Sequence, residues 1–270
     1  MSMNKLRDLY AAGKPAIGTF FSSGNAAMME CLGYTGLDFA VIDTEHGPFD
    51  TETMQDLIRA AEHAGLAPVV RIADVTHKEI QRAADCGAQG LIIPCLRSLD
   101  DFKKAVDLAK YAPAGNRGFI KGRGAGFGYA EWTKGPLEEY FAKSNEKLML
   151  IPQCETVEAL EQIEEIAALP GVDGIFIGPF DLSTTMGIPG QFADPDFLAA
   201  ELRIKKACEA AGKPCYILSM TEEEGSRLLN EGYAGVAHSL DFAMFTDAYT
   251  KTVRAIRDGL KKKDGSRRTR

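Results

Sequence analysis

The chain has 270 residues, of which 45% are hydrophobic and 26% charged, and this composition excludes an intrinsically disordered protein. Its net charge of −7 argues against nucleic acid as the main partner, because phosphate binding needs a basic surface. No apolar stretch approaches the length of about 18 residues that a membrane span needs, so we expect no membrane partner.

The first residues and the cysteines bear on the compartment. Lys5 and Arg7 place charges where a secretion signal would need an apolar segment, so we expect a cytoplasmic protein. The chain has six cysteines and none of them forms a CxxC pair, which predicts reduced, mostly packed thiols without a disulfide framework or a zinc site.

Eight short apolar segments of strand length follow one another along the chain. Segments with helical apolar spacing, such as 54–61 and 160–167, lie between most of them. Strand and helix alternating eight times predict the α/β class and a (β/α)8 TIM barrel, in which helices surround a closed parallel sheet. A barrel of this kind commonly has this length as a single domain. The predicted strands are 16–21, 38–43, 67–72, 90–94, 148–153, 173–177, 214–218 and 234–237.

The structural alternative is a doubly wound open sheet, which usually carries a glycine-rich phosphate turn after its first strand. The sequence 22–25 (Ser-Ser-Gly-Asn) lacks that turn, so the barrel is preferred. The glycine-rich segment 111–147 is too short for a separate domain, and we interpret it as an excursion of the barrel wall. We expect residues 1–260 to form the barrel domain and the basic segment 261–270 to be a disordered tail.

Polar residues stand where several of these strands end. His46 follows the second strand and Arg71 closes the third. Glu155 closes the fifth and Asp181 follows the sixth. Because the loops after the strands of such a barrel converge on the face where active sites lie, we expect these four side chains to share one pocket.

Glu155 and Asp181 fit a hard divalent cation such as Mg²⁺ or Mn²⁺, which prefers oxygen ligands and is commonly held by one or two carboxylates. Each acid taken alone also fits a simpler interpretation. Asp181 precedes Leu182 and could cap a short helix, and Glu155 precedes a helical segment that starts at Val157.

Arg71 brings a permanent cation beside the barrel core, where it needs a paired acid or a bound anion. A structural salt bridge is one interpretation, and stabilisation of an oxyanion is the functional one. His46 lies shortly after Asp43, so we expect the Asp43 carboxylate to orient the imidazole and raise its basicity. Of the other histidines, His238 alone is expected to reach the pocket.

A metal, an arginine for an oxyanion and a histidine base suggest chemistry on the carbon next to a carbonyl. A 2-keto acid would chelate the metal through its carboxylate and keto oxygens, and the metal and Arg71 would hold the enolate formed by C–C cleavage. Proton transfer would run through His46 or a metal-bound water. No lysine stands at a comparable strand end, which disfavours a Schiff-base mechanism.

Five motifs occur in order along most of the chain. They are Asp43-Thr44-Glu45-His46-Gly47-Pro48, Pro68-Val69-Val70-Arg71, Gly87-Ala88-Gln89-Gly90-Leu91-Ile92-Ile93-Pro94, Gln153-Cys154-Glu155-Thr156 and Gly178-Pro179-Phe180-Asp181-Leu182-Ser183. In these motifs the chain resembles the HpcH/HpaI aldolase family, the metal-dependent class II pyruvate aldolases that act on 2-keto-3-deoxy sugar acids and 4-hydroxy-2-ketoheptanedioate.

The resemblance implies a reaction that cleaves or forms the C–C bond between pyruvate and an aldehyde in a 4-hydroxy-2-keto acid. It implies that Glu155 and Asp181 bind Mg²⁺, Mn²⁺ or Co²⁺, that Arg71 stabilises the pyruvate enolate, and that His46 paired with Asp43 handles the proton. The substrate-binding residues that it implies are Gln153, Gly178, Pro179, Phe180 and Asp181, with the amides near Phe180 and Asp181 holding the pyruvate carboxylate.

The resemblance also implies a homo-oligomer, a hexamer built as a trimer of dimers that exchange their last helix. The helical stretch 242–260 could serve that purpose. Two departures concern the aldehyde. His238 stands where the family usually has a glycine-rich turn and could supply a second proton-transfer group. Arg117, in the excursion, precedes a segment 119–124 that we do not assign to a subfamily, so the acceptor aldehyde stays open.

Three kinds of alternative remain, of which the first includes two reactions. Oxaloacetate-type decarboxylation and a C–C ligation like that of macrophomate synthase would use the same pyruvate enolate. An acyl-CoA thioester lyase would need a larger basic surface than Arg117, Lys121 and Arg123 provide. A barrel that binds a small acid without turning it over is the non-catalytic alternative, and metal affinity would discriminate against it.

Overall fold

Eight parallel strands close into a barrel in chain order in the computed structural model, which describes residues 4–266 and side chains as far as residue 260. Each strand pairs with its neighbours in sequence, and β8 pairs back onto β1. The predicted (β/α)8 barrel and its eight strands are therefore confirmed. The strands are β1 (Ala16–Phe21), β2 (Phe39–Asp43), β3 (Ala67–Arg71), β4 (Gly90–Ile93), β5 (Met149–Cys154), β6 (Ile175–Ile177), β7 (Cys215–Ser219) and β8 (Gly235–Leu240).

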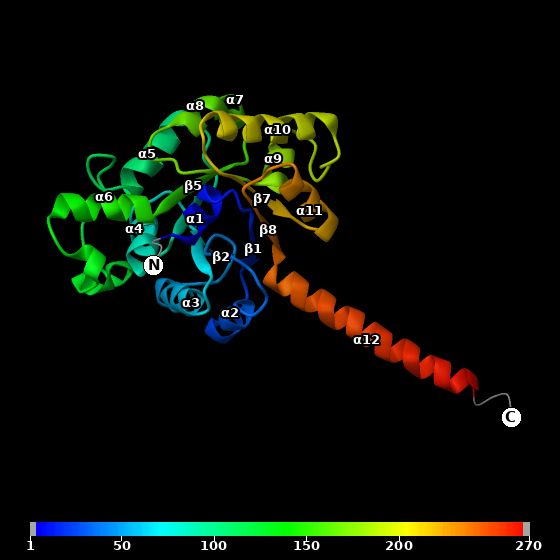
Figure 1. Cartoon of the computed structure of the whole chain (residues 1–270). Helices are drawn as coiled ribbons and strands as arrows, with labels where there is room; N and C mark the ends of the chain where they lie inside the picture. The colour runs from blue at the N-terminus through cyan, green and yellow to red at the C-terminus, as the bar shows by residue number, and fades with distance from the viewer. Residues whose placement is uncertain (1–3, 267–270) are drawn as a thin grey trace.

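Helices follow the strands and surround the barrel (Figure 1). Many begin at a polar residue whose side chain accepts a bond from a first-turn amide, as Asp50 does for α3 and Ser98 does for α5. The helices are α1 (Lys5–Ala11), α2 (Ala26–Leu32), α3 (Thr51–His63), α4 (His77–Cys86), α5 (Leu99–Ala109), α6 (Leu137–Lys147), α7 (Val157–Glu161), α8 (Ile163–Ala168), α9 (Pro179–Thr185), α10 (Pro195–Ala210), α11 (Glu222–Asn230) and α12 (Asp241–Ser266), with the 3-10 helices η1 (Arg123–Gly128) and η2 (Glu131–Thr133).

Side chains alternate between the inside and the outside of the barrel along each strand. On β2, Phe39 and Val41 belong to the inner apolar cluster, whereas Ala40 and Ile42 pack with the surrounding helices. The same alternation on the other strands fills the barrel interior with apolar side chains. These include Phe20, Ala67, Val69, Ile92, Met149, Ile151, Phe176, Tyr216 and Ala237.

The amino ends of the strands are closed by α1, which lies over that end of the barrel (Figure 1). Leu6 joins the inner cluster, and the Asn4 side chain donates to the carbonyl oxygens of Gln89 and Lys147, which precede β4 and β5. The polar side chains at the opposite, carboxyl end of the barrel are thus separated from solvent on the amino side by several apolar layers.

A buried ion network lies beside α1. The Lys110 ammonium, with only 3% of its side chain exposed, contacts the Asp173 carboxylate at 2.6 Å and donates to the carbonyl oxygen of Leu148. Arg7 contacts the other oxygen of Asp173 at 2.7 Å. Since these residues come from α1, the end of α5 and the loop before β6, the network connects elements distant in sequence.

The segment 111–147 forms the expected excursion and contains η1, η2 and α6. It has a small apolar cluster of its own, in which Tyr111, Ala125 and Tyr140 are buried and Trp132 and Phe141 pack against them. Contacts between η1 and α4 hold the excursion against the barrel wall.

The last helix, α12, leaves the barrel instead of lying along it (Figure 1). Its start is anchored by Asp241, whose carboxylate accepts bonds from the amides of Ser22, Ser23 and Gly24. The helix passes residue 260, where we expected the barrel domain to end, and continues to Ser266; the rest of the predicted tail lies outside the described residues. No helix in the described range 4–266 is long and apolar enough to cross a membrane.

Candidate active site

The inward-facing positions become polar at the carboxyl ends of three strands. Asp43 ends β2 two residues after Val41, Arg71 ends β3 two residues after Val69, and Gln153 follows Ile151 on β5. The register aligns Asp43 with Arg71 on neighbouring strands. The period-two alternation that builds the apolar interior therefore also directs these three side chains into the barrel mouth.

Asp43 and Arg71 form a buried bidentate ion pair. The Arg71 Nε and Nη2 atoms donate to Asp43 Oδ1 and Oδ2 at 2.9 and 2.7 Å. The guanidinium also lies 4.8 Å from the centre of the Phe20 ring. Burial alone would raise the pKa of Asp43, but the hydrogen bond and charge of Arg71 outweigh it and leave that pKa below its ordinary value. Arg71 is thus a fixed cation with 9% of its surface exposed.

His46 does not contact Asp43 through its ring, contrary to the sequence expectation. Asp43 Oδ1 instead accepts the backbone amides of Glu45 and His46 at 3.1 and 3.3 Å, and Oδ2 accepts the Ser22 hydroxyl. Together with the two bonds from Arg71, both oxygens of the Asp43 carboxylate therefore accept hydrogen bonds from groups other than the His46 ring. The imidazole is 69% exposed, and its Nε2 lies 4.0 Å from Glu45 Oε2. The carboxylate nearest the His46 ring is therefore Glu45.

Glu45 lies between the arginine and the histidine. Its Oε2 atom is 3.2 Å from Arg71 Nε. Burial raises the pKa of Glu45, and the charges of Asp43 and Asp181 act in the same direction, while Arg71 and His46 oppose them. Glu45 thus connects the fixed cation to the exposed imidazole.

Glu155 is almost completely buried, with 3% of its surface exposed, and each of its oxygens has a donor. The Cys95 amide donates to Oε1, and Gln153 Nε2 donates to Oε2 at 2.6 Å. Burial raises the pKa of Glu155 to about 7, helped by the charges of Asp181 and Glu45 and opposed by the Cys95 amide and Arg71. The group therefore changes charge near neutral pH.

A glycine keeps space open beside these two side chains. A Cβ atom on Gly178 would lie 2.6 Å from Glu155 Oε2 and 2.7 Å from Gln153 Nε2, closer than real Cβ contacts. Pro179 then starts α9, and Asp181 lies exposed in its first turn. The Asp181 charge acts on the pKa values of Glu155 and Glu45, so it belongs to the same end of the barrel. Phe180 is partly exposed and packs edge-on against Phe192.

The donor set can be tested against a divalent cation. Within residues 4–266 there is no group of three or more His, Cys, Asp or Glu side chains arranged to hold a metal ion. Glu155 and Asp181 supply two carboxylates, a number that suffices for Mg²⁺ when waters and substrate complete its shell. Gln153 Oε1 is buried and has no protein partner among the described residues, so it could accept a bond from such a water. Burial raises the pKa of Glu155 and the charges of Asp181 and Glu45 add to it, and a bound cation would offset that repulsion between acids. These residues therefore fit the group.

His238 does not join this cluster. It follows the inward-facing Ala237 on β8, so its side chain is on the outer face, where Nδ1 lies 3.2 Å from the Ser219 hydroxyl. That hydroxyl lies beside Gly225 of α11. The expectation that His238 reaches the pocket is not met, because the alternation of the strand turns its ring toward the surrounding helices.

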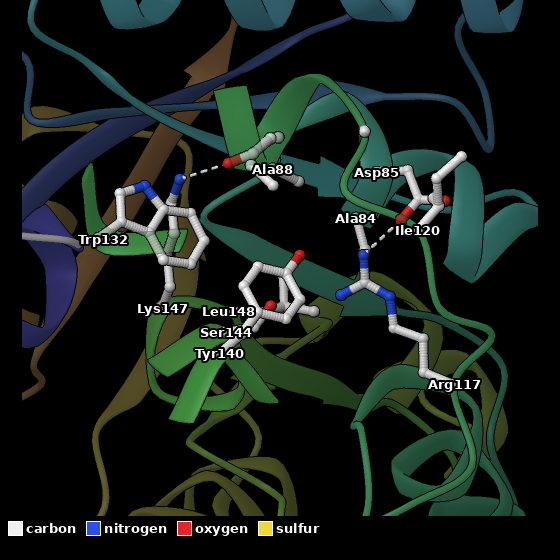
Figure 2. A pocket seen from close by; sticks show the side chains of 14 residues that line it. Ala84, Asp85, Ala88, Arg117, Ile120, Trp132, Tyr140, Ser144, Lys147 and Leu148 are labelled. Atoms are coloured by element: carbon white, nitrogen blue, oxygen red, sulfur yellow. Dashed lines mark hydrogen bonds and ion pairs between the residues drawn. The ribbon is translucent and has the colours of Figure 1, made fainter. Parts of the chain in front are cut away.

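Arg117 also lies elsewhere, in a pocket between α4 and the excursion. Figure 2 shows its guanidinium directed at Asp85, which it contacts at 2.6 Å, with Tyr140 and Trp132 lining the same pocket. The guanidinium is also stacked 4.7 Å from the centre of the Tyr111 ring. This part of the wall precedes β4 and β5, so Arg117 is at the opposite end of the strands from Glu155.

Sequence reasoning passed over two site residues, Glu45 and Cys95. Glu45 was part of a motif without a role, and Cys95 was grouped with the packed thiols, yet it is exposed. Its Sγ lies 3.8 Å from Glu45 Oε1, and partial burial of the sulfur, together with the neighbouring acids, raises the pKa of the thiol to about 11. Cys95 follows β4 directly after Pro94, so the strand-end rule that found Arg71 would have found it too.

A closed parallel barrel with a buried arginine and several acids at the carboxyl ends of its strands is the arrangement of a barrel enzyme. The chain belongs to the HpcH/HpaI aldolase/citrate lyase family, whose sequence model matches residues 16–248. The resemblance predicted from the five motifs is thereby confirmed.

Individual relatives agree with the family. The chain is 35% identical over 241 residues to the 2-dehydro-3,6-dideoxy-6-sulfogluconate aldolase of Pseudomonas putida, covering 89% of this chain and 92% of the relative. It is 32% identical over 254 residues to the 5-keto-4-deoxy-D-glucarate aldolase of Citrobacter koseri, covering 94% and 96%. The crystal structure of an HpcH/HpaI aldolase from Desulfitobacterium hafniense DCB-2 is similar with a TM-score of 0.85, 28% identity and coverage of 93% and 96%. The chain is accordingly a carbon–carbon lyase.

Proposed function

We propose that the chain is a metal-dependent aldolase that cleaves or forms the C–C bond between pyruvate and an aldehyde in a 4-hydroxy-2-keto acid. The observation that carries the proposal is the polar layer at the barrel mouth, to which β2 and β3 contribute the Asp43–Arg71 pair and the end of β5, beyond β4, contributes Gln153 and Glu155. Two relatives are named as aldolases of a deoxy-sulfogluconate and a deoxy-glucarate, which supports a sugar-acid substrate.

Glu155 and Asp181 would hold the cation, which we propose to be Mg²⁺, Mn²⁺ or Co²⁺. When bound there, a divalent cation would polarise the keto oxygen of the substrate and so favour the enolate. The chain's own contribution is to keep Glu155 fixed between the Cys95 amide and Gln153, and to leave room for substrate above Gly178.

Arg71 would stabilise the negative charge that develops on the enolate oxygen. Its position is set before substrate arrives, because two bonds to Asp43 and the Phe20 ring fix the guanidinium. A preorganised donor of this kind is worth roughly 3–4 kcal/mol of transition-state stabilisation. Asp43 acts here as the positioning partner of Arg71.

His46 would move the proton. In the cleavage direction it takes the proton of the C4 hydroxyl, the C3–C4 bond breaks, the aldehyde leaves, and the bond's electron pair remains in the pyruvate enolate. The imidazole is exposed at the mouth, as a group that meets the aldehyde portion should be, and its Nε2 lies 4.0 Å from Glu45 Oε2. The backbone amides near Phe180 and Asp181 would bind the pyruvate carboxylate.

The test is exchange of the pyruvate methyl protons in D₂O, followed by NMR with Mg²⁺ or Mn²⁺ and then with a chelator. This assay forms the enolate without requiring the aldehyde. Metal-dependent exchange supports the proposal and justifies a screen of aldehydes. Absence of exchange with every metal, in protein shown to be folded, would contradict it and favour a thioester lyase or a non-catalytic barrel.

We also propose that the chain is a homo-oligomer, a hexamer built from dimers that exchange α12. A barrel helix normally packs back on its own sheet, but α12 projects away from the barrel. Its exposed apolar side chains form a stripe along the helix. Phe245 is 56% exposed and Ile256 is 60% exposed on this stripe. A second copy of the chain would cover it. The stripe comprises Phe242, Phe245, Tyr249, Val253, Ile256 and Leu260.

A further inference from the structure

The turn after β4 contacts two acids that come from different parts of the barrel mouth. The Cys95 amide donates to Oε1 of Glu155, which follows β5. The Cys95 thiol lies 3.8 Å from Oε1 of Glu45, in the loop after β2. One residue therefore reaches both the acid proposed to bind metal and the acid beside the Arg71 and His46 side chains.

The backbone of this turn has an uncommon conformation. Cys95 has a φ of 60°, in the left-handed region that residues with a side chain rarely adopt. Such a conformation persists only when the surroundings fix it. Here Leu96 is buried, and the Thr156 hydroxyl donates to the Leu96 carbonyl oxygen at 3.0 Å. The turn is thus tied to the end of β5 by two bonds, one to Glu155 and one from Thr156.

We propose that Cys95 is a positioning residue for the reaction: its amide fixes Glu155 for metal binding, and its thiol fixes Glu45 beside Arg71 and His46. This inference rests on the proposed function, since it takes Glu155 as a metal ligand. The left-handed backbone is what points the amide and the thiol of a single residue at two different carboxylates.

The two parts of the inference can be separated by substitution. Cys95→Gly removes the side chain and its restriction on φ, so the turn also samples other backbone conformations and the amide donates to Glu155 less constantly. Cys95→Ala removes the thiol and keeps a side chain at the turn. Cys95→Ser restores a donor toward Glu45. Phe127→Gly is the matched control, because Phe127 has a φ of 56° in the excursion and is remote from this turn in sequence.

The experiment measures three quantities for each full-length variant: the Mn²⁺ dissociation constant by calorimetric titration, the thermal midpoint of the metal-free protein, and the rate of pyruvate methyl exchange. We expect Cys95→Gly to bind Mn²⁺ about tenfold more weakly, a usual effect of removing support behind a metal ligand. Its metal-free midpoint should equal or exceed that of the parent, since glycine suits a positive φ.

We expect Cys95→Ala to bind Mn²⁺ as the parent does and to exchange pyruvate protons about tenfold more slowly, as when support behind a functional group is lost. Cys95→Ser should recover most of that rate. Phe127→Gly should leave Mn²⁺ binding unchanged. A merely structural role for Cys95 would change the thermal midpoint of the variants and would leave the ratio of Mn²⁺ affinity to exchange rate as it is in the parent.

The inference is overturned if Cys95→Gly and Cys95→Ala match the parent in Mn²⁺ affinity and exchange rate. It is also overturned if the Cys95→Ala loss is not recovered by Cys95→Ser, a comparison that still decides if the glycine variant fails to fold. A parent protein that neither binds Mn²⁺ nor exchanges protons would instead remove the proposed function, and this inference with it.

Discussion

The buried position of Glu155 favours the binding of a cation and lowers the stability of the metal-free protein. Its pKa of about 7, against an ordinary 4.5, means that burial penalises the charged form. A carboxyl with a raised folded pKa lowers stability as pH rises from 4.5, and the loss is complete above pH 7. The size of the shift corresponds to about 3 kcal/mol.

The replacement Glu155→Gln should therefore stabilise the metal-free protein at pH 8 and weaken its metal binding. The gain should shrink as pH falls through 7 and vanish near 4.5, because the parent group becomes neutral across that window. Thermal unfolding at a series of pH values, with a chelator present, measures it. A stability difference independent of pH would mean that burial does not penalise the Glu155 charge.

Arg71→Lys should lose most of the activity despite keeping the charge. Lysine cannot reproduce the two-pronged contact with Asp43, and its ammonium would not be fixed for the enolate. We expect a fall of about 10²- to 10³-fold in the rate of pyruvate methyl exchange, the usual cost of an oxyanion donor. Exchange at the parental rate in the Arg71→Lys protein would assign enolate stabilisation to another group.

Sequence reasoning placed Arg71 and Glu155 at the ends of strands because a strand end is visible in the sequence. It could not predict the ion pair between Arg71 and Asp43, because the two residues become neighbours only through the register of β2 and β3. It therefore predicted that Asp43 orients the His46 ring, whereas the acid nearest to that ring is Glu45. Contacts within the site depend on tertiary closure, which spacing along the chain does not specify.

Among the elements, the amino end of the barrel depends on the ion network around Asp173. This carboxylate contacts Lys110 and Arg7 and accepts the amide of Leu150 at 2.8 Å, so it connects α5, α1 and β5. The sequence showed these charges without their partners, because the three elements meet only when the barrel closes.

Asp173→Ala should destabilise the protein by about 3–5 kcal/mol, because it leaves the Lys110 ammonium buried without its counter-charge. Chemical denaturation followed by circular dichroism gives the value. Glu158→Ala is the matched control, since it breaks an exposed ion pair with Arg97 and should leave the denaturation midpoint unchanged. If the two variants unfold alike, the buried network contributes no more than a surface pair.

At the scale of the whole molecule, the eight strands were predictable because apolar segments and helical spacing repeat along the chain. The direction of α12 was not, since its sequence is that of an ordinary amphipathic helix. Its stripe, which includes Tyr249 and Leu260, is exposed, and no residue of the described range 4–266 covers it.

Ile256→Glu should dissociate the assembly without unfolding the barrel, because it puts a charge into the apolar stripe. Light scattering coupled to size-exclusion chromatography gives the molar mass, and circular dichroism checks the fold. Lys251→Glu, a charge change at an exposed position on the same helix, is the control. A parental molar mass for the Ile256→Glu protein would contradict helix exchange.

The alternation along β2, β3 and β5 has an evolutionary consequence. Deleting one residue within β5 would turn Gln153 toward the helices and, by the same shift, would exchange the apolar side chains that fill the barrel with those that pack against the helices. A one-residue shift in the register of a strand therefore disrupts the site and the apolar core together. Lineages that diverge from this chain should therefore vary in loops and helices, where insertions leave the strand phase untouched, while the strands accept substitutions only in place.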